Sequence, residues 1–216
     1  MYEICFFDLD GTLTQSEFGV GASIRGALKH FGVPEPDDQE LRRYIGPPLM
    51  HSLRHYAGLT GEQIGEAIEI YRSLYNTKGY QDAPLYPGIP EALDRLKAAG
   101  KTLAVVTSKP EGIARKVLEY QGLFRWFTDL FGPDDSERES GKEELIRKAI
   151  RHYGLSDGRR AVMIGDRKYD ILGAKGAGID SIGVLYGYGS REELIEAGAT
   201  WIAERPEELP DRVEHG

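Results

Sequence analysis

The chain is poor in cysteine: Cys5 is its only one in 216 residues. No intrachain disulfide can form, so we expect a reducing compartment. Cys5 lies inside an apolar run, and we interpret it as inert packing. The sequence also has no apolar stretch of membrane-spanning length, and its first residues enter an apolar segment without a basic leader. These absences predict a soluble, cytoplasmic protein.

Positive charge is also in short supply. The chain has 27 Lys and Arg against 35 Asp and Glu, which gives a formal net charge of −8 and a pI of about 5.2. Such an acidic balance argues against nucleic acid or an anionic membrane as the main partner, while a small anionic substrate remains compatible with local positive charge. The length allows one sizeable core or a core with a smaller inserted domain, and we expect a monomer or small homo-oligomer.

Four short apolar runs stand out, at residues 4–7, 103–106, 161–164 and 181–185. Helical patterns separate these runs, and this alternation is typical of a parallel sheet with helices on both faces. We therefore predict an α/β fold with a Rossmann-like core, whose catalytic groups lie at the carboxyl ends of the strands. The charged tail at 204–216 predicts a last short helix followed by a frayed end.

A long insertion separates the first two apolar runs. Its apolar residues recur at helical spacing, as in Ile64, Ala67, Ile68, Tyr71 and Leu74. No strand pattern interrupts it, so we predict a helical domain, called here the cap, over residues 15–83. The α/β core then comprises residues 1–14 and 84–216, and the chain crosses between the two near 16–21 and 82–88.

Two aspartates end the first apolar run, in the segment Asp8-Leu9-Asp10 followed by Gly-Thr. Alternate side chains of an extended segment share a face, so Asp8 and Asp10 would place two like charges together at the end of a strand. Such a pair tolerates ionisation beside a cation, and a hard divalent metal is the natural counterion. The sequence therefore predicts a metal-assisted site at this turn.

This opening resembles the first motif, DxDGT, of the haloacid dehalogenase superfamily. The other three motifs of that family have candidates in the same order: Thr107 after the second apolar run, Lys142 near a helix start, and GDRKYD at 165–170. The resemblance therefore extends over essentially the whole chain. It implies the subclass I arrangement, in which a helical cap follows the first motif.

The resemblance also implies roles for the matching residues. Asp8 would attack the phosphoryl group, and Asp10 would protonate the leaving oxygen and later deprotonate a water molecule. Thr107 and the amide of Ser108 would hold phosphate oxygens. Lys142 would serve as a catalytic and phosphate-binding cation that balances the charge of Asp8 and the phosphate.

The predicted cofactor is Mg²⁺, which prefers oxygen ligands and retains water. Its predicted protein ligands are Asp8, the main-chain carbonyl of Asp10, and Asp166. Asp170 is expected to act through a water molecule. The predicted substrate is a small-molecule phosphate monoester.

Asp10 favours a phosphatase over a dehalogenase, because cleavage of a carbon–halogen bond needs no acid for a leaving alkoxide. Three segments, at 45–49, 86–89 and 183–189, resemble the phosphoglycolate phosphatase group and especially its 5′-nucleotidase-like branch. A phosphomutase of the β-phosphoglucomutase type shares the four motifs and is one alternative. A non-catalytic binding or regulatory module is another, although the paired acids count against it.

Substrate choice would depend on cap residues that close over the site. The candidates on flanking segments are Arg42, Arg43, Pro47, Pro48, Arg54 and Lys78. An arginine would suit a glycolate carboxylate and tyrosines would suit a nucleotide, and the sequence leaves both open. His51 and His55 have metal-capable spacing but lack the accompanying Glu, so we favour a surface role. We also reject dinucleotide binding by the glycines of 173–178.

Overall fold

The structure, a computed structural model, describes residues 2–47, 49–134, 141–156 and 158–215. Within these residues the core is one sheet of six parallel strands in the order β3-β2-β1-β4-β5-β6. The strands are β1 (Ile4–Phe7), β2 (Thr102–Val106), β3 (Asp129–Phe131), β4 (Ala161–Gly165), β5 (Asp180–Val184) and β6 (Trp201–Ala203). The predicted α/β fold with a parallel sheet is confirmed.

Four of these strands coincide with the predicted apolar runs to within a residue at either end. The other two, β3 and β6, were not predicted, because each spans only three residues and includes a polar or amphipathic side chain, Asp129 or Trp201. Both lie at the edges of the sheet, where a short strand needs one neighbour only. The central strand β1 pairs with β2 and β4 and is buried throughout.

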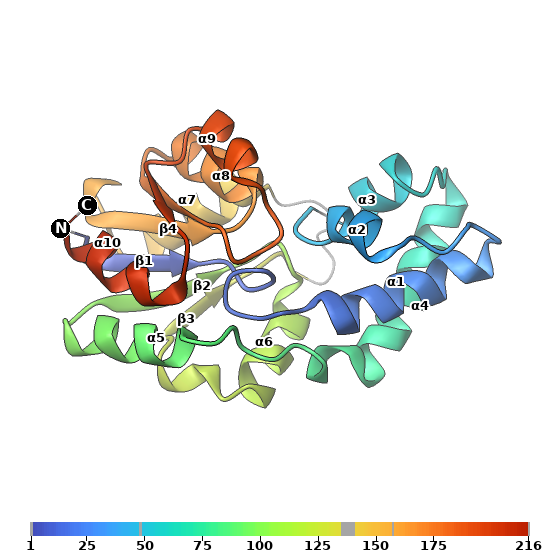
Figure 1. Ribbon diagram of the computed structural model, residues 1–216, viewed down its shortest axis with the longest axis horizontal. Coiled ribbons are helices and arrows are strands. Elements are labelled where there is room, and N and C mark those ends of the chain that lie inside the picture. Colours follow the sequence, from blue (N-terminus) through green and yellow to red (C-terminus); the bar gives the residue numbers. More distant parts are fainter. Residues whose placement is uncertain (1, 48, 135–140, 157, 216) are drawn as a thin grey trace.

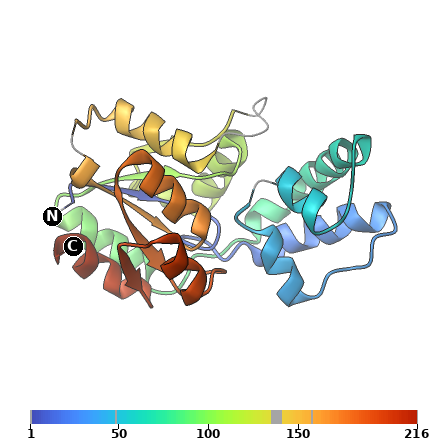
Figure 2. The ribbon, with the colours of Figure 1, turned by 90° about the horizontal axis from the view of Figure 1, so that it is seen from above.

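Helices cover both faces of the sheet (Figure 2). Alternate residues of β1 serve the two faces: Cys5 and Phe7 belong to one apolar cluster, and Ile4 and Phe6 to the other. The first cluster includes side chains of α5 (Ile89–Ala98), α6 (Glu111–Tyr120) and α10 (Leu209–His215). The second includes side chains of α7 (Lys142–His152) and α8 (Lys168–Ala177), and α9 (Arg191–Ala197) packs beside α8.

The charged tail carries the last short helix that we predicted. After the 3₁₀ turn Pro206–Glu208, helix α10 continues to His215. Leu209 and Val213 of this helix are fully buried in the core cluster that contains Cys5. Two apolar side chains one helical turn apart therefore anchor an otherwise charged segment. The frayed end that we expected after this helix lies outside the described residues.

The insertion is helical, as predicted, and lies beyond one end of the sheet (Figure 1). Its elements are α1 (Glu17–His30), α2 (Asp38–Leu41), η1 (Arg42–Tyr44), α3 (Leu49–His55), α4 (Glu62–Thr77) and η2 (Gly79–Gln81). They share an apolar cluster of their own that includes Ile24, Leu53 and Tyr75. The division at residues 14/15 and 83/84 stays a prediction.

The two chain crossings between core and cap run side by side. The main-chain amide of Gln15 donates to the carbonyl of Pro84 at 2.8 Å, and that of Tyr86 donates to Leu13 at 3.2 Å. Backbone pairing at this point holds the turn after β1 next to the returning chain. The carboxyl end of β1 therefore opens toward the cap.

Candidate active site

The turn after β1 brings Asp8 and Asp10 to the carboxyl edge of the sheet. The carbonyl of Leu9 accepts hydrogen bonds from the amides of Leu13 and Thr14, at 2.9 and 3.0 Å, which closes the turn. Gly11 has a φ of +86°, and a Cβ atom there would lie 2.3 Å from Asp166 Oδ2. The position therefore requires glycine for its backbone conformation and for its close approach to Asp166.

Asp8, Asp166 and Asp170 form a buried acidic cluster. Each offers a carboxylate oxygen within 4.8 Å of the other two. Burial, together with the charges of Asp170 and Asp8, raises the pKa of Asp166 well above its usual value. Burial and the charge of Asp8 likewise raise the pKa of Asp170 to about 6, against the opposing effect of Lys142. Three crowded hard-oxygen donors of this kind suit a divalent cation.

Asp166 is held in this cluster by its neighbours. Its Oδ2 accepts a hydrogen bond from the amide of Tyr188 at 2.8 Å, and Thr12 Oγ1 lies 3.5 Å from Oδ1. Asp170 also accepts from the amide of Arg167 at 3.1 Å, at the start of α8. Main-chain amides thus fix the positions of the Asp166 and Asp170 carboxylates, and both carboxylates face Asp8.

The side chain of Asp10 does not belong to this cluster in the described residues, although Asp10 was among the predicted metal ligands. Its carboxylate is instead paired with Lys109 Nζ, at 2.7 Å from Oδ2 and 2.9 Å from Oδ1. This separation follows from the turn, which directs the two aspartates to different neighbours. A contact of Asp10 with a metal is left to its main-chain carbonyl, as the motif implied.

Lys142 reaches the acidic cluster from the first turn of α7. Its Nζ lies 2.8 Å from Asp8 Oδ1, 2.8 Å from Asp170 Oδ1 and 3.0 Å from the carbonyl of Val106. Burial opposes the charge of this lysine, but Asp170 and Asp8 outweigh burial and raise its pKa above the usual value. The structure thus brings Lys142 to Asp8 as predicted.

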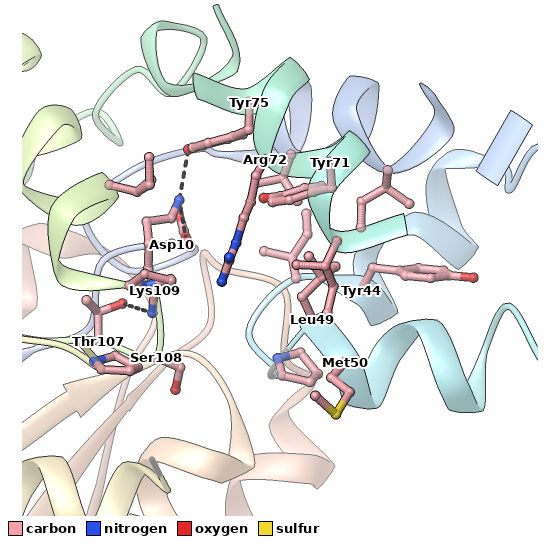
Figure 3. Close-up of a pocket in the computed structure, with 18 of the residues that line it drawn as sticks. Asp10, Tyr44, Leu49, Met50, Tyr71, Arg72, Tyr75, Thr107, Ser108 and Lys109 are labelled. Carbon is pink, nitrogen blue, oxygen red and sulfur yellow. Dashed lines mark hydrogen bonds and ion pairs between the residues drawn. The ribbon is translucent and has the colours of Figure 1, made fainter. Parts of the chain in front are cut away.

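Thr107 and Ser108 follow β2 and line a cavity of about 460 Å³ together with Asp8 and Asp10 (Figure 3). The amide of Thr107 donates to the carbonyl of Phe131 in the neighbouring strand at 2.9 Å. Its hydroxyl oxygen accepts from the amide of Lys109 at 3.2 Å, so Thr107 also stabilises the turn before α6. Both predicted phosphate-binding residues therefore face the same space as the predicted nucleophile.

The cap supplies the other wall of the cavity. This wall is largely apolar and aromatic, with side chains of Val20, Ile24, Tyr44, Leu49, Met50, Ile68 and Tyr71. One cation, Arg72 of α4, points from the cap into the cavity (Figure 3). The ion pair that the structure gives Arg72 is with the exposed Glu69, at 3.4 Å. Arg72 was not predicted as a substrate contact, whereas Tyr71 is one of the cap tyrosines that we expected to suit a nucleotide.

The predicted cap candidates differ in whether they line the cavity. Pro47 lines the cavity, and Pro48 lies outside the described residues. The remaining four, Arg42, Arg43, Arg54 and Lys78, are exposed and do not line it. These four charged side chains therefore face solvent rather than the cavity.

Two weaker sequence signals, the histidine pair and the glycines at 173 and 176, lie in helices α3 and α8. His51 and His55 have ring centroids 4.2 Å apart, and their expected surface role stays a prediction. Gly173 and Gly176 lie within α8, where a Cβ atom would lie 2.9 Å from Lys142 Cγ and 2.3 Å from Glu143 Oε2, respectively. These glycines allow α8 to pack closely on α7.

Sequence reasoning also missed Arg167, which connects the core to the cap. Its Nη1 donates to the carbonyl of Ile45 at 2.6 Å, and its Nε pairs with Glu193 at 2.9 Å. A Cβ atom at Gly46, which has a φ of +99°, would lie 2.9 Å from Arg167 Cγ. The residue after Asp166 thus holds the cap segment at 45–46 beside the acidic cluster.

A parallel sheet with a buried acidic cluster and lysine at its carboxyl edge, under a helical cap, defines a hydrolase of the α/β class. Residues 5–184 match the family described as haloacid dehalogenase-like hydrolases, and the chain belongs to this family. It is 39% identical over 193 residues to a 5′-nucleotidase of Pseudomonas aeruginosa, covering 89% of this chain and 87% of that protein.

Two further comparisons agree with this assignment. The chain is 30% identical over 215 residues to a phosphoglycolate phosphatase of Vibrio parahaemolyticus, covering 96% of this chain and 94% of the relative. The crystal structure of a predicted phosphatase from Clostridium acetobutylicum matches with a TM-score of 0.95 and 37% identity over the whole of both chains. The protein is a phosphatase of this family.

None of its described helices combines the length and apolar character needed to cross a bilayer.

Proposed function

We propose that the protein is a Mg²⁺-dependent phosphatase that hydrolyses a small-molecule phosphate monoester through an aspartyl phosphate on Asp8. The observation that carries this proposal is the position of Asp8. Its carboxylate contacts the buried Lys142, adjoins Asp166 and Asp170, and opens on the cavity that Thr107 and Ser108 line.

In the first step, a carboxylate oxygen of Asp8 attacks phosphorus and the bond to the leaving oxygen breaks. Asp10 gives a proton to the leaving alkoxide. Thr107 and the amide of Ser108 hold the phosphoryl oxygens, and Lys142 offsets the negative charge that gathers at Asp8. In the second step, Asp10 takes a proton from the attacking water, and phosphate leaves Asp8.

The acidic cluster fits Mg²⁺ because its donors are all oxygens and because burial raises the pKa of Asp166 and Asp170, an effect that a bound cation would oppose. Asp8, Asp166 and the main-chain carbonyl of Asp10 would hold the ion directly, and Asp170 through water. When bound, the ion would neutralise charge on the phosphate oxygens.

The cavity favours a leaving group larger than glycolate. Its volume of about 460 Å³ is within the range of sites that enclose drug-sized ligands, and its cap wall is mainly apolar. Tyr71 offers a flat surface to a base, and Arg72 offers donors to oxygen atoms of the substrate. Of the two substrates suggested by the relatives' names, a 5′-nucleotide therefore fits this wall better than phosphoglycolate.

Phosphate release is the direct test. The protein would be assayed with Mg²⁺, with and without EDTA, against nucleoside monophosphates, phosphoglycolate, sugar phosphates and an aryl phosphate. We expect metal-dependent release that is fastest with a nucleoside monophosphate and absent in Asp8→Asn. Near wild-type turnover by Asp8→Asn would contradict the mechanism. Conversion of sugar phosphates only after priming by a bisphosphate would indicate a mutase instead.

A further inference from the structure

The ammonium group of Lys109 joins the core to the cap at the candidate site. Its Nζ pairs with both carboxylate oxygens of Asp10, at 2.7 and 2.9 Å, and donates to the hydroxyl oxygen of Tyr75 at 2.8 Å. Nζ also lies 4.5 Å from the centroid of the Tyr75 ring, within the range of a cation–π contact. Figure 3 shows this chain of contacts from α4 to Asp10.

Tyr75 is fixed rigidly within the cap. It is 1% exposed, and its ring is stacked on Tyr71 with centroids 5.6 Å apart and an angle of 9° between the ring planes. A Cβ atom at Gly79 would lie 2.7 Å from the Tyr75 ring, so the backbone also packs closely against it. Burial and the charge of Asp10 raise the pKa of Tyr75 well above its usual value, which keeps the phenol neutral.

The geometry has a consequence for Asp10. Lys109 contacts both oxygens of the Asp10 carboxylate and so fixes the plane of that group. Lys109 is itself buried, with a side chain 6% exposed, so Tyr75 and Asp10 determine where its ammonium group lies. The contact therefore holds Asp10 in one orientation, as a base that must take a proton from an attacking water requires.

We propose that Tyr75 and Lys109 are positioning residues that hold Asp10 as the base for hydrolysis of the aspartyl phosphate, so that cap helix α4 contributes to the second chemical step. This inference rests on the proposed function. In that step a water oxygen bonds to phosphorus while the bond between phosphorus and Asp8 Oδ breaks. The water proton moves to Asp10, Asp8 recovers its carboxylate, and inorganic phosphate is released.

The test is a rapid-quench experiment with 4-nitrophenyl phosphate and Mg²⁺, in which 4-nitrophenol release reports formation of the phosphoenzyme and acid-stable protein-bound phosphate reports its decay. Tyr75→Phe removes only the hydroxyl group. We expect it to slow decay about tenfold, the size that loss of one hydrogen bond to a charged group predicts, while the rate of formation stays unchanged. A burst of 4-nitrophenol should then precede the steady state.

Lys109→Met should show the same pattern with a slower decay, and it tests the inference from the core side if Tyr75→Phe folds poorly. Tyr56→Phe is the matched control, since Tyr56 is a cap tyrosine that is 40% exposed and lies outside the cavity lining. It should behave as wild type. Circular dichroism would verify the fold of each variant.

The inference would be overturned if both Tyr75→Phe and Lys109→Met slowed formation and decay equally, or if both left decay unchanged. The proposed function would survive either result, because the wild type would still pass through a phosphoenzyme. A wild type that hydrolyses the aryl phosphate with no protein-bound phosphate would overturn the proposed function and this inference with it. A selective loss of the decay step in both variants would support the inference.

Discussion

Replacing Asp170 with asparagine is expected to stabilise the metal-free protein at pH 7. Asp170 is buried beside Asp8 and Asp166, and burial is the main reason that its pKa rises from 3.8 to about 6. The folded protein binds this proton more tightly than the unfolded chain does, so protonation of Asp170 stabilises the fold. This contribution to the free energy of unfolding is complete below the unfolded-state pKa and is lost as the pH rises through about 6. Asparagine keeps an acceptor for the amide of Arg167 and carries no charge at any pH.

The size of the effect follows from the pKa. A change from 3.8 to about 6 corresponds to at most about 3 kcal/mol in the free energy of unfolding at pH 7, because asparagine also removes one of the two carboxylates that pair with the buried Lys142. For a chain of this size, about 2 to 4 °C of melting temperature accompany each kcal/mol, so Asp170→Asn should melt higher by at most about 6 to 12 °C. At about pH 4 the two proteins should melt at nearly the same temperature, because Asp170 is then largely protonated when folded.

Thermal unfolding followed by circular dichroism in EDTA, at pH 4 and pH 7, measures this difference. Mg²⁺ at one hundred times its dissociation constant should then stabilise the wild type by about 2.7 kcal/mol and the variant by less. Asp82→Asn, at an exposed aspartate, is the control and should melt like the wild type at both pH values. A lower melting temperature for Asp170→Asn at pH 7, or a difference that is the same at both pH values, would refute the reasoning.

Two further predictions concern the cations of the site. Lys142→Met should lower kcat by about a hundredfold or more in saturating Mg²⁺, because Lys142 no longer offsets the negative charge that gathers at Asp8 during phosphoryl transfer, and steady-state phosphate release would measure this. Retained turnover would remove Lys142 from the mechanism. Arg72→Ala should raise KM for the preferred substrate about tenfold through loss of a charged hydrogen bond, whereas Arg54→Ala, at an exposed cap position outside the cavity, should not. An unchanged KM in Arg72→Ala would exclude substrate contact by this arginine.

The sheet shows how far local patterns determine the fold. The strands β1, β2, β4 and β5 were predictable because each carries apolar side chains in a short and mostly buried run. The edge strands β3 and β6 follow from pairing with a neighbour, a long-range interaction that a three-residue segment does not reveal. Leu209 and Val213 anchor the last short helix, which was predictable as an element, although its charged sequence did not show that it packs on the core.

The site residues that follow strands were also predictable from the sequence, whereas those on the cap helix were not. Asp8, Thr107 and Asp166 follow strands that end at one edge of a parallel sheet, so their order in the sequence was enough to bring them together. Tyr75 and Arg72 belong to a helix whose periodicity predicts a buried face but not which core residue that face meets. Their positions depend on how the cap packs over the sheet, which involves contacts between residues far apart in the chain.

The proposed mechanism depends on a covalent bond between Asp8 and the phosphoryl group. After incubation with an aryl phosphate labelled in its phosphoryl group, acid quenching and proteolysis, the labelled peptide would be identified. The mechanism predicts an acid-stable, hydroxylamine-labile phosphate on the peptide that contains Asp8, and no such phosphate in Asp8→Asn. A label on any other residue, or hydrolysis without protein-bound phosphate, would contradict it.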